Sequence, residues 1–478
     1  MHQPERSSSL YDPGLGSRRS KPGFLFTRSV RWIYDKVSQA TGLGITQNVI
    51  DCYAAIIRLA KPEDRIFLFG FSRGAYTIRS VAAVVALCGV PTRNRDGNKL
   101  PLDESGSKNL ATYAVKHIYQ FTPSRKKEKA TPRQKFLLET RKKLAKRFRA
   151  ECASSNPANA ERANVYPYFV SAFDTVAALG SLSQSVGASA VYAGMAALVS
   201  FVLSYALQLP LIGGYLGFLN FWPIYIVLLA VAITIALCIY IGTHTKFDFH
   251  VPGYSAWQQV QTFHFTVEWK HTFYDTDLNI NIPYAKHAIS IDENRRDFAR
   301  VRWGVPDGRP DRDEYNNLTF EQVWFPGNHT DVGGGYKENE SRLSDAALKW
   351  ILACAYIIPN GIRYDKSVLR LYPDSGGMQH DEVKSGFGAI PNFFGRTWTY
   401  GARELPKMDN KGVSDATMHR SVYERFDMDE VPQYDVMQEY RPGTLAIHVD
   451  FKDAYANPKG KSNPDRSAVA QYIEDRLP

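Results

Sequence analysis

The amino-acid sequence predicts an α/β protein with a mostly parallel central sheet, interrupted by an inserted pair of transmembrane helices. Two observations carry this prediction. Apolar runs of strand length alternate with polar turns and amphipathic helices along the chain. One segment of 71 consecutive residues, 175–245, contains no Asp, Glu, Lys or Arg. The 478 residues are enough for one large elaborated domain or for two modest ones.

Six segments carry the α/β pattern. Residues 65–70, 168–173 and 319–325 are short apolar runs, as expected of parallel strands that are buried on both faces. Helical spacing of apolar residues is found in 48–60, 75–87 and 343–355. The last third of the chain is rich in Pro, Gly and aromatic residues, so we expect irregular, loop-rich structure there.

The uncharged segment predicts a membrane hairpin. Residues 188–209 and 223–241 are each long enough to cross a hydrocarbon core of roughly 30 Å. A buried helical pair in a large core is the alternative. The hairpin, 184–245, would divide one domain into a first part, 1–183, and a second part, 246–478, on the same side of the membrane. No apolar stretch of a secretory signal is visible at the start, so we expect an integral membrane protein whose catalytic body faces the cytoplasm.

The charge is concentrated in one basic insertion, 123–151. Within it, residues 125–149 hold 12 Lys or Arg and two Glu, which accounts for the whole net charge of +10. No fold or aromatic interleaving typical of nucleic-acid binding accompanies this charge, so we do not expect a nucleic-acid partner. The insertion is either a solvated surface helix or a site for anionic lipid headgroups.

Composition restricts the class further. The hydrophobic and charged fractions, 44% and 22%, are globular values and exclude global disorder. Five scattered cysteines form no CxxC pair, which argues against a disulfide framework or a thiolate zinc site and favours a reducing compartment.

The first candidate for chemistry is the pentapeptide Gly70-Phe71-Ser72-Arg73-Gly74, which has the pattern GxSxG between a predicted strand and a predicted helix. A nucleophile elbow requires this placement, and the flanking glycines let the strand and the helix approach closely. We therefore predict that Ser72 is a nucleophile. The backbone N–H of Arg73, at the start of the helix, would stabilise an oxyanion. The alternative is an ordinary turn serine.

A nucleophilic serine needs a base, and two histidines are candidates. His329 lies in a Gly-rich loop directly after the strand 319–325, where α/β sheets place their active-site loops. A histidine that caps its own turn is the alternative for this position. His287 is the rival base, but it lies in a segment, 285–292, that we expect to be helical and where a structural role is commoner.

The base needs an orienting acid, and again there are two candidates. Asp174 ends a buried strand, where a carboxylate is costly unless it is paired. Asp331 is only two residues from His329 and could serve instead. A more distant acid usually has better reach to Nδ1, which favours Asp174.

Several motifs occur in a fixed order: Gly70–Tyr76, Phe173-Asp174-Thr175-Val176, His287–Glu293 with Arg295-Arg296, and Trp324–Tyr336. In this order they resemble the catalytic domain of the type VI secretion lipase-effector family of bacteria and fungi. Tyr11–Gly16, Met418–Val422 and Tyr440-Arg441-Pro442 also resemble pieces of that family.

The resemblance implies an α/β-hydrolase fold and a Ser72, Asp174, His329 triad in a phospholipase-type esterase, without a metal or an organic cofactor. The family opens with a buried strand that ends in an Asp-Gly-Thr turn, upstream of a Tyr-Asp-Pro-Gly stretch. Only ten residues precede Tyr11, and none forms such a strand. We therefore expect either that the true start of the chain lies upstream, or that the sheet lacks this strand and the oxyanion donor that follows it.

The sequence thus predicts a membrane-anchored serine hydrolase that acts on membrane lipids. Two alternatives remain. One is a catalytically silent, membrane-tethered interaction domain that lost its first strand. The other is an antibacterial lipase effector that delivers itself into a target membrane.

Overall fold

A computed structural model describes most of the chain and divides it into two compact units, Met1–Ala178 with Phe273–Pro478, and Leu179–Thr272. The predicted insertion, 184–245, lies within the second unit. The residues that the structure describes are 8–11, 45–61, 63–99, 103–123, 131–176, 194, 197–205, 221–249, 255–262, 265–269, 277–295, 300–382, 416–457, 460–463 and 473–477.

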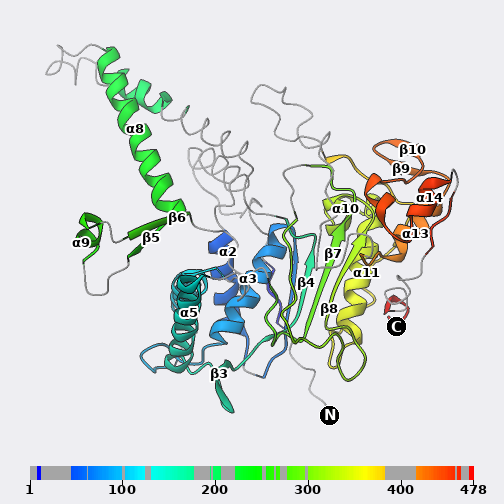
Figure 1. Cartoon of the computed structure of the whole chain (residues 1–478), viewed down its shortest axis with the longest axis horizontal. Coiled ribbons are helices and arrows are strands. Elements are labelled where there is room, and N and C mark those ends of the chain that lie inside the picture. The colour runs from blue at the N-terminus through cyan, green and yellow to red at the C-terminus, as the bar shows by residue number, and fades with distance from the viewer. Residues whose placement is uncertain are drawn as a thin grey trace. The chain divides into compact units, whose positions relative to one another are not determined.

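The first unit is built on a parallel sheet (Figure 1). Its described strands are β1 (Ile66–Phe71), β4 (Pro167–Phe173), β7 (Tyr284–Ser290) and β8 (Phe320–Phe325), in the order β1-β4-β7-β8. Phe71 pairs with Phe173, Phe173 with Ala288, and Ser290 with Phe325. All four strands therefore end at one edge of the sheet, where their connecting loops meet.

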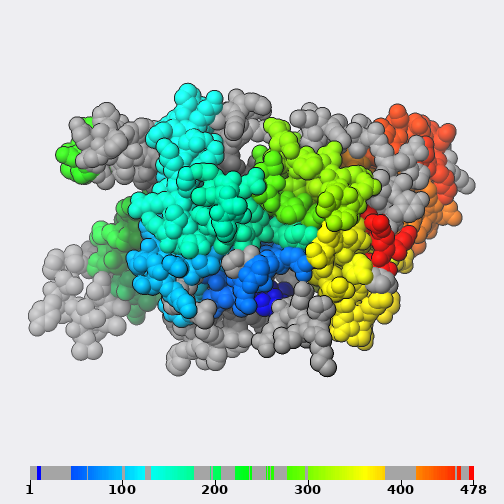
Figure 2. Space-filling model, turned by 90° about the horizontal axis from the view of Figure 1, so that it is seen from below, coloured from blue at the N-terminus to red at the C-terminus, as the bar shows by residue number. Residues whose placement is uncertain are grey.

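Helices cover both faces of this sheet (Figure 1). The helices before β4 are α2 (Ile45–Leu59), α3 (Arg73–Cys88), α4 (Glu104–Tyr113) and α5 (Pro132–Glu151), and those after β8 are α10 (His329–Gly333) and α11 (Arg342–Ile357). On one face, Ala75 and Ala82 of α3 pack on Val170 and Ala172. On the other, α11 packs on the sheet in a cluster that contains Trp350, Phe169 and Phe325. In the space-filling view, the yellow part of the chain, which includes α11, lies beside the yellow-green part that precedes it in the sequence (Figure 2).

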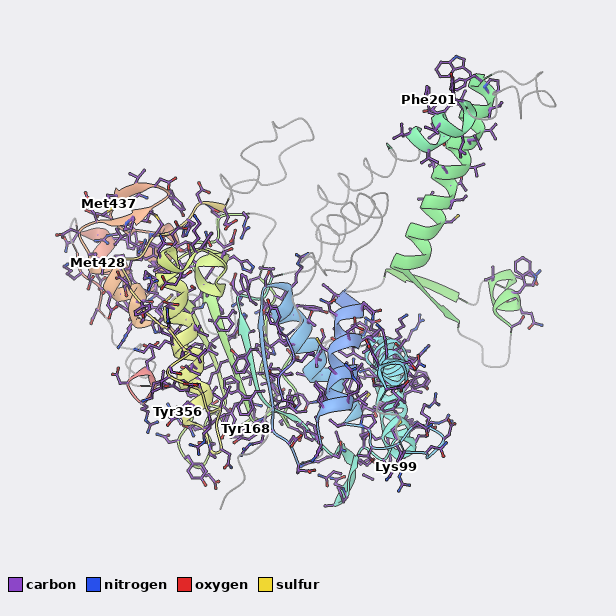
Figure 3. All side chains as sticks on the ribbon, turned by 180° about the vertical axis from the view of Figure 1, so that it is seen from behind. Lys99, Tyr168, Phe201, Tyr356, Met428 and Met437 are labelled. Atoms are coloured by element: carbon purple, nitrogen blue, oxygen red, sulfur yellow. The ribbon has the colours of Figure 1, made fainter. Side chains whose placement is uncertain are left out.

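The described part of the last third contains short elements. They are α13 (Arg420–Asp427), β9 (Val431–Gln433), β10 (Val436–Gln438) and α14 (Lys452–Ala456). Apolar side chains of α13, β9 and α14 pack in one cluster with Ile289 and Trp324, at the β8 end of the sheet. Met428 and Met437 mark this region at one end of the unit in Figure 3. Two further antiparallel strands, β2 (Ser155–Asn156) and β3 (Asn159–Ala163), follow α5.

The predicted elements at 48–60, 65–70, 75–87, 168–173, 319–325 and 343–355 are confirmed within a few residues as α2, β1, α3, β4, β8 and α11. The expected helix around His287 is wrong, because residues 284–290 form the central strand β7. Lys286 and His287 interrupt its apolar pattern. The fold tolerates them because Lys286 Nζ lies 2.9 Å from Glu321 and His287 is hydrogen-bonded through its ring.

The basic insertion contains a well-capped helix. Thr131 and Gln134 form a capping box at the start of α5, with Pro132 as its first residue. Phe148 is buried in the cluster with α2 and α3, and Arg149 donates to the carbonyl of Leu87. Part of the basic charge therefore stabilises the fold. Other described Lys and Arg of α5 are exposed, namely Arg133, Lys135, Lys142, Lys143, Lys146 and Arg147, and residues 124–130 of the insertion lie outside the described residues.

The second unit contains α8 (Phe221–His244), β5 (Thr245–Phe249), α9 (Ala256–Gln261) and β6 (Phe265–Trp269), with β5 and β6 antiparallel. Phe201, labelled in Figure 3, packs its ring edge-on against Phe221 of α8. Side chains of α8 are described for residues 221–235, 237 and 238. Counted over the described residues, no helix is long and apolar enough to cross a membrane. The predicted hairpin with spans at 188–209 and 223–241 is therefore not supported, and much of its first span lies outside the described residues.

Candidate active site

Ser72 occupies the sharp turn between β1 and α3. Its backbone has φ 59° and ψ −123°, a conformation that residues with a side chain rarely adopt. Its N–H donates to the carbonyl of Phe173 at 3.0 Å, so the turn continues the backbone ladder between β1 and β4. Such strain persists only where the surrounding structure enforces it, and it is typical of functional positions.

The two glycines of the pentapeptide have different roles. A Cβ on Gly70 would lie 2.5 Å from the carbonyl oxygen of Gly74, so the strand and the helix cross in backbone contact. A Cβ on Gly74 would meet no atom within 4 Å. The expectation that both glycines must lack a side chain for close packing therefore holds only for Gly70.

Asp174 follows β4 at the same edge of the sheet. It is fully buried, with φ 39°, and its N–H donates to the carbonyl of Ala288 at 2.7 Å. Its Oδ1 accepts the backbone N–H of Ser290 at 3.1 Å. Its Oδ2 lies 2.6 Å from Nδ1 of His329. Asp174 is thus a buried carboxylate with acceptor contacts on both oxygens.

His329 begins α10, directly after β8, and is 3% exposed. The hydrogen bond to Asp174 requires a proton on Nδ1, which leaves Nε2 of the neutral ring as the acceptor. The ring stacks on Phe71, the residue before Ser72, with centroids 4.5 Å apart. A Cβ on Gly333 would lie 1.9 Å from the Phe71 ring, so α10 also contacts the elbow closely. The structure therefore brings His329, Asp174 and the Ser72 turn to one place.

His287, the rival base, has a structural environment. Its Nε2 accepts the backbone N–H of Thr175 at 3.2 Å, and Nδ1 lies 3.2 Å from the side-chain oxygen of Gln322. Burial lowers the pKa of His287 well below its ordinary value, and the positive charges of Arg300 and Arg79 lower it further. Both ring nitrogens are occupied within the fold, which favours His329 as the base.

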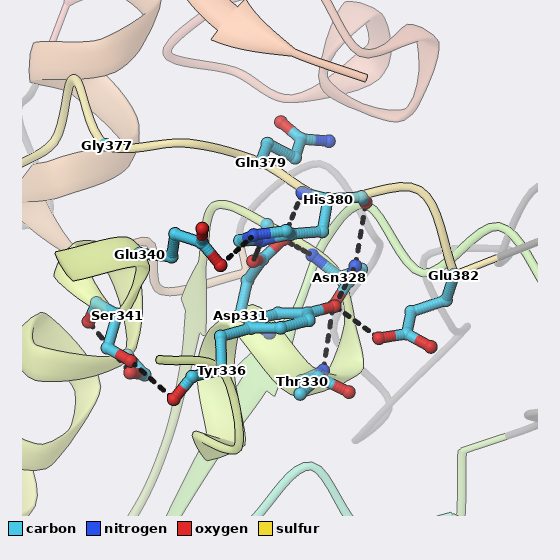
Figure 4. Close-up of polar contacts among 12 residues, drawn as sticks. Asn328, Thr330, Asp331, Tyr336, Glu340, Ser341, Gly377, Gln379, His380 and Glu382 are labelled. Carbon is cyan, nitrogen blue, oxygen red and sulfur yellow. Dashed lines mark hydrogen bonds and ion pairs between the residues drawn. The ribbon is translucent and has the colours of Figure 1, made fainter. Parts of the chain in front are cut away.

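Asp331, the rival acid, pairs with a different histidine. Its Oδ1 lies 2.7 Å from Nδ1 of His380, and its Oδ2 accepts the N–H of Asn328 at 3.0 Å (Figure 4). Burial raises the pKa of Asp331. For His380, burial alone would lower the pKa, but the hydrogen bond and charge of Asp331 outweigh it, so the pKa is raised. Asp174 is therefore the acid that contacts His329.

A further buried carboxylate holds the backbone of His329. Glu293 is 1% exposed, and its Oε2 accepts the N–H of His329 at 3.1 Å. Arg295 donates to both oxygens of Glu293 at 2.7 Å and lies 3.5 Å from Glu382. The guanidinium compensates the charge of Glu293, as a buried carboxylate requires.

Asp292 holds the same loop at Gly327, two residues before His329. Its Oδ2 accepts the N–H of Gly327 at 2.6 Å and the hydroxyl of Tyr440 at 2.8 Å. Burial raises the pKa of Asp292 to about 7, with a smaller contribution from the charge of Asp331. The hydrogen bonds and the charge of Arg425 act in the opposite direction but do not compensate.

The sequence patterns did not assign these supporting groups. Asp292 and Glu293 lie in a motif that the resemblance singled out, and a carboxylate just after a buried strand is a signal for a paired site. His380 has no local pattern and lies far from His329 in the sequence, so only the fold reveals it. Among the described residues, no group of three or more His, Cys, Asp or Glu could hold a metal ion.

An α/β sheet with a serine at a strand–helix elbow and a nearby carboxylate–imidazole pair is the arrangement typical of serine hydrolases. A family model described as "T6SS, Phospholipase effector Tle1-like, catalytic domain" matches residues 2–203 and 244–354. The match covers more than half of the chain, and the chain belongs to this family. The resemblance seen in the motifs is thus confirmed. No curated protein and no solved structure matches significantly. The match omits residues 204–243, which contain most of α8, and it ends before residues 355–478.

The glycine pair gives a first prediction. Gly70→Ala should destabilise the protein by several kcal/mol, because the new methyl group would overlap backbone atoms of Gly74 and Ala75. These atoms can move away only if the helix α3 shifts. Gly74→Ala should be neutral or stabilising by up to about 1 kcal/mol, since alanine is the better helix former. Urea unfolding of the two variants measures both effects. Equal destabilisation by the two substitutions would contradict the close contact at Gly70.

Asp292 gives a second prediction. Between about pH 4 and about pH 7, Asp292 is protonated in the folded protein and ionised in the unfolded chain. The contribution of this group to stability is therefore present at low pH and lost as the pH rises toward about 7. Asp292→Asn keeps an oxygen acceptor for Gly327 and Tyr440 without the charge. It should raise the unfolding free energy at about pH 8, by on the order of 2 kcal/mol.

The same substitution should flatten the dependence of stability on pH. Urea midpoints of the wild type and of Asp292→Asn, measured from about pH 5 to about pH 8, give the comparison. Parallel curves for the two proteins would show that Asp292 titrates normally.

Proposed function

We propose that this chain is a serine hydrolase that cleaves acyl ester bonds of phospholipids, with Ser72 as nucleophile, His329 as base and Asp174 as orienting acid. The observation that carries this proposal is the buried contact of 2.6 Å between Asp174 Oδ2 and His329 Nδ1, beside the strained turn at Ser72. Membership of a phospholipase-effector family supports the substrate class.

In the first half of the reaction, the Ser72 oxygen attacks the acyl carbonyl while His329 Nε2 takes the hydroxyl proton. Asp174 stabilises the imidazolium through Nδ1–H. The tetrahedral intermediate then collapses, its carbon–oxygen bond to the alcohol breaks, and His329 returns the proton to the leaving lysolipid. Water repeats these steps on the acyl-enzyme and releases the fatty acid and free Ser72.

The oxyanion needs donors that are fixed before the reaction. Arg73 is the first residue of α3, and the first turn of a helix directs its N–H groups toward its N-terminus. We assign the Arg73 N–H as one donor. In such hydrolases a second donor follows an early strand, and the sequence predicts that this strand is lacking here.

The second unit offers a surface for the lipid itself. Large apolar side chains of α8 are 48–66% exposed, namely Trp222, Ile226, Val227, Val231, Ile233, Ile235 and Leu237. Exposed apolar groups of this extent are typical of surfaces that bind a partner or a lipid phase. We propose that α8 contacts the acyl region of the membrane that holds the substrate.

The exposed face of α5 would add attraction to anionic headgroups. Lys142, Lys146 and Arg147 form surface ion pairs with Glu139, Glu161 and Glu151. Surface pairs of this kind contribute little and leave the face basic. Each basic residue near an anionic membrane contributes about 1 kcal/mol, and salt screens the attraction.

The triad predicts the labelling of Ser72. A fluorophosphonate probe should react covalently with the wild-type protein and not with Ser72→Ala. Labelling should slow by on the order of 10²–10⁴-fold in His329→Ala and in Asp174→Asn, because the serine loses its base or the base loses its orientation. Intact-mass spectrometry over time gives the rates, and hydrolysis of a phospholipid substrate should follow the same order.

His287→Gln is the matched control, since it changes the other buried histidine near the strand ends. It should label at close to the wild-type rate once its folding has been confirmed by circular dichroism. If His287→Gln lost labelling and His329→Ala kept it, the assignment of the base would be reversed. A folded wild-type protein that neither reacts nor hydrolyses lipid would favour a silent interaction domain.

The lipid contact predicts the effect of charge on α8. Val227→Asp with Val231→Asp should lower the amount of protein that sediments with vesicles about tenfold or more, because each Asp in an apolar phase costs about 2.5–3.5 kcal/mol. The loss should be similar with neutral and with anionic vesicles. Any preference for anionic vesicles should persist and decrease with salt, because it comes from α5.

Val436→Asp with Met437→Asp is the matched control, since these apolar residues are equally exposed on β10 of the other unit. Sedimentation of this control should equal that of the wild type. Loss of binding in both double variants would show a general effect of charge and remove the role assigned to α8.

A further inference from the structure

A second carboxylate–imidazole pair lies on the same short helix as the first. Asp331 is two residues after His329, is 2% exposed, and contacts Nδ1 of His380 at 2.7 Å. The backbone N–H of His380 also donates to Asp331, at 3.2 Å. No step of the proposed reaction uses this pair, and His380 lies beyond the part of the chain that matches the family.

His380 belongs to a segment, Gln379–Glu382, that passes over the loop carrying His329 (Figure 4). We name this segment the strap. Its first residue is fixed to the strand β9: the Gln379 N–H donates to the carbonyl of Pro432 at 3.0 Å, and its carbonyl accepts the N–H of Tyr434 at 2.9 Å. The strap therefore has a rigid attachment on the side away from the loop.

Besides the contact with Asp331, the strap contacts the loop at three further points. The carbonyl of His380 accepts a hydrogen bond from the Asn328 side chain at 2.8 Å. The imidazole of His380 stacks on Tyr336, with centroids 3.6 Å apart. The hydroxyl of Tyr336 donates to Glu382, which also lies 3.5 Å from Arg295. Each contact holds a residue on one side or the other of His329.

These contacts converge on the first turn of α10. The side-chain oxygen of Asn328 caps the helix by accepting the N–H groups of Thr330 and Asp331, at 2.8 and 2.9 Å. Asp331 completes the capping box by accepting the Asn328 N–H. A helix of five residues has too few internal hydrogen bonds to be stable alone. Its geometry therefore depends on the cap and on the groups that hold the cap.

The hydrogen bond from the imidazole of His380 has a specific part in this arrangement. Asp331 is buried, and a buried carboxylate without a partner is costly. His380 supplies this partner as two hydrogen bonds, one from Nδ1 at 2.7 Å and one from its backbone N–H at 3.2 Å. Loss of this partner would weaken the cap that fixes the backbone at His329. His380 would thus act on His329 indirectly, through Asp331 and Asn328.

We propose that the strap fixes the first turn of α10 and that His380 is a positioning residue for His329. This proposal rests on the proposed function only in taking His329 as the base. Its structural part, the immobilisation of residues 327–336 by His380, stands independently and has its own measurement.

The experiment compares His380→Ala and His380→Asn in the full chain. Alanine removes the contact with Asp331, whereas the Asn amide nitrogen is as far along the side chain as Nδ1 of histidine and can donate to Asp331. Fluorophosphonate labelling of Ser72 should slow about tenfold or more in His380→Ala, because small displacements of a base are costly. Labelling in His380→Asn should return to within about threefold of the wild type.

Hydrogen exchange supplies the readout that does not depend on activity. Amides of residues 327–336 should exchange faster in His380→Ala than in the wild type, and His380→Asn should restore most of their protection. His117→Ala is the matched control, since His117 is an exposed histidine that stacks on Tyr113 with centroids 5.1 Å apart. It should change neither the labelling of Ser72 nor the exchange of residues 327–336.

The outcomes separate the two proposals. A wild-type protein that is not labelled rejects the proposed function, and the exchange comparison then decides on the strap alone. Wild-type labelling and unchanged exchange in His380→Ala would overturn the strap. So would a loss of labelling that His380→Asn does not restore. If His380→Ala does not fold, Tyr336→Phe carries the test, because it removes the hydroxyl contacts with Asn328 and Glu382 and should speed exchange in the same residues.

Discussion

The backbone ladder of the parallel sheet continues past the ends of the strands, and the geometry of the candidate site depends on this continuation. The N–H of Ser72 donates to Phe173 at 3.0 Å, the N–H of Asp174 to Ala288 at 2.7 Å, and the N–H of Asp292 to Gly327 at 3.1 Å. Each bond joins a residue one or two positions after the end of a strand to a neighbouring strand or loop. Residues that are far apart in sequence are therefore placed by main-chain hydrogen bonds, and their side chains need only short reach to meet.

This placement imposes costs that the surroundings must compensate. Ser72 and Asp174 both have positive φ, at roughly 1–3 kcal/mol each for a residue other than glycine. Three carboxylates are at most 2% exposed, those of Asp174, Glu293 and Asp331. Each would strongly destabilise the fold without a partner. His329, Arg295 and His380 supply these partners. Replacing such pairs with apolar groups is often neutral or stabilising in proteins, so their value here lies in fixing one arrangement.

The same distinction explains which features could be predicted from the sequence. Apolar runs identified β1 and β4, because parallel strands buried on both faces need few polar residues. The segment of β8 was also predicted, although it contains Glu321 and Gln322. The strand β7 was mistaken for a helix because Lys286 and His287 are compensated by contacts with other segments, which no local pattern reveals. Ser72, Asp174 and His329 were predicted as a triad, and their arrangement around one edge supports that prediction without testing the chemistry. His380 could not be predicted, since its partner Asp331 lies in another loop. The uncharged segment predicted a hairpin that the described residues do not support.

The arrangement around His329 separates three tasks among three groups. Asp174 acts on the imidazole itself and determines which nitrogen carries the proton. Glu293 holds the backbone N–H of the same residue, and the Asn328–Asp331 cap holds the turn that follows. In the proposed reaction, the base approaches the Ser72 oxygen and then a leaving alcohol. Such a base needs both ring orientation and a fixed main chain, because neither alone prevents displacement. All three groups belong to the part of the chain that matches the family, whereas the strap that holds the cap does not. Relatives without an equivalent segment would therefore have to support this cap through other contacts.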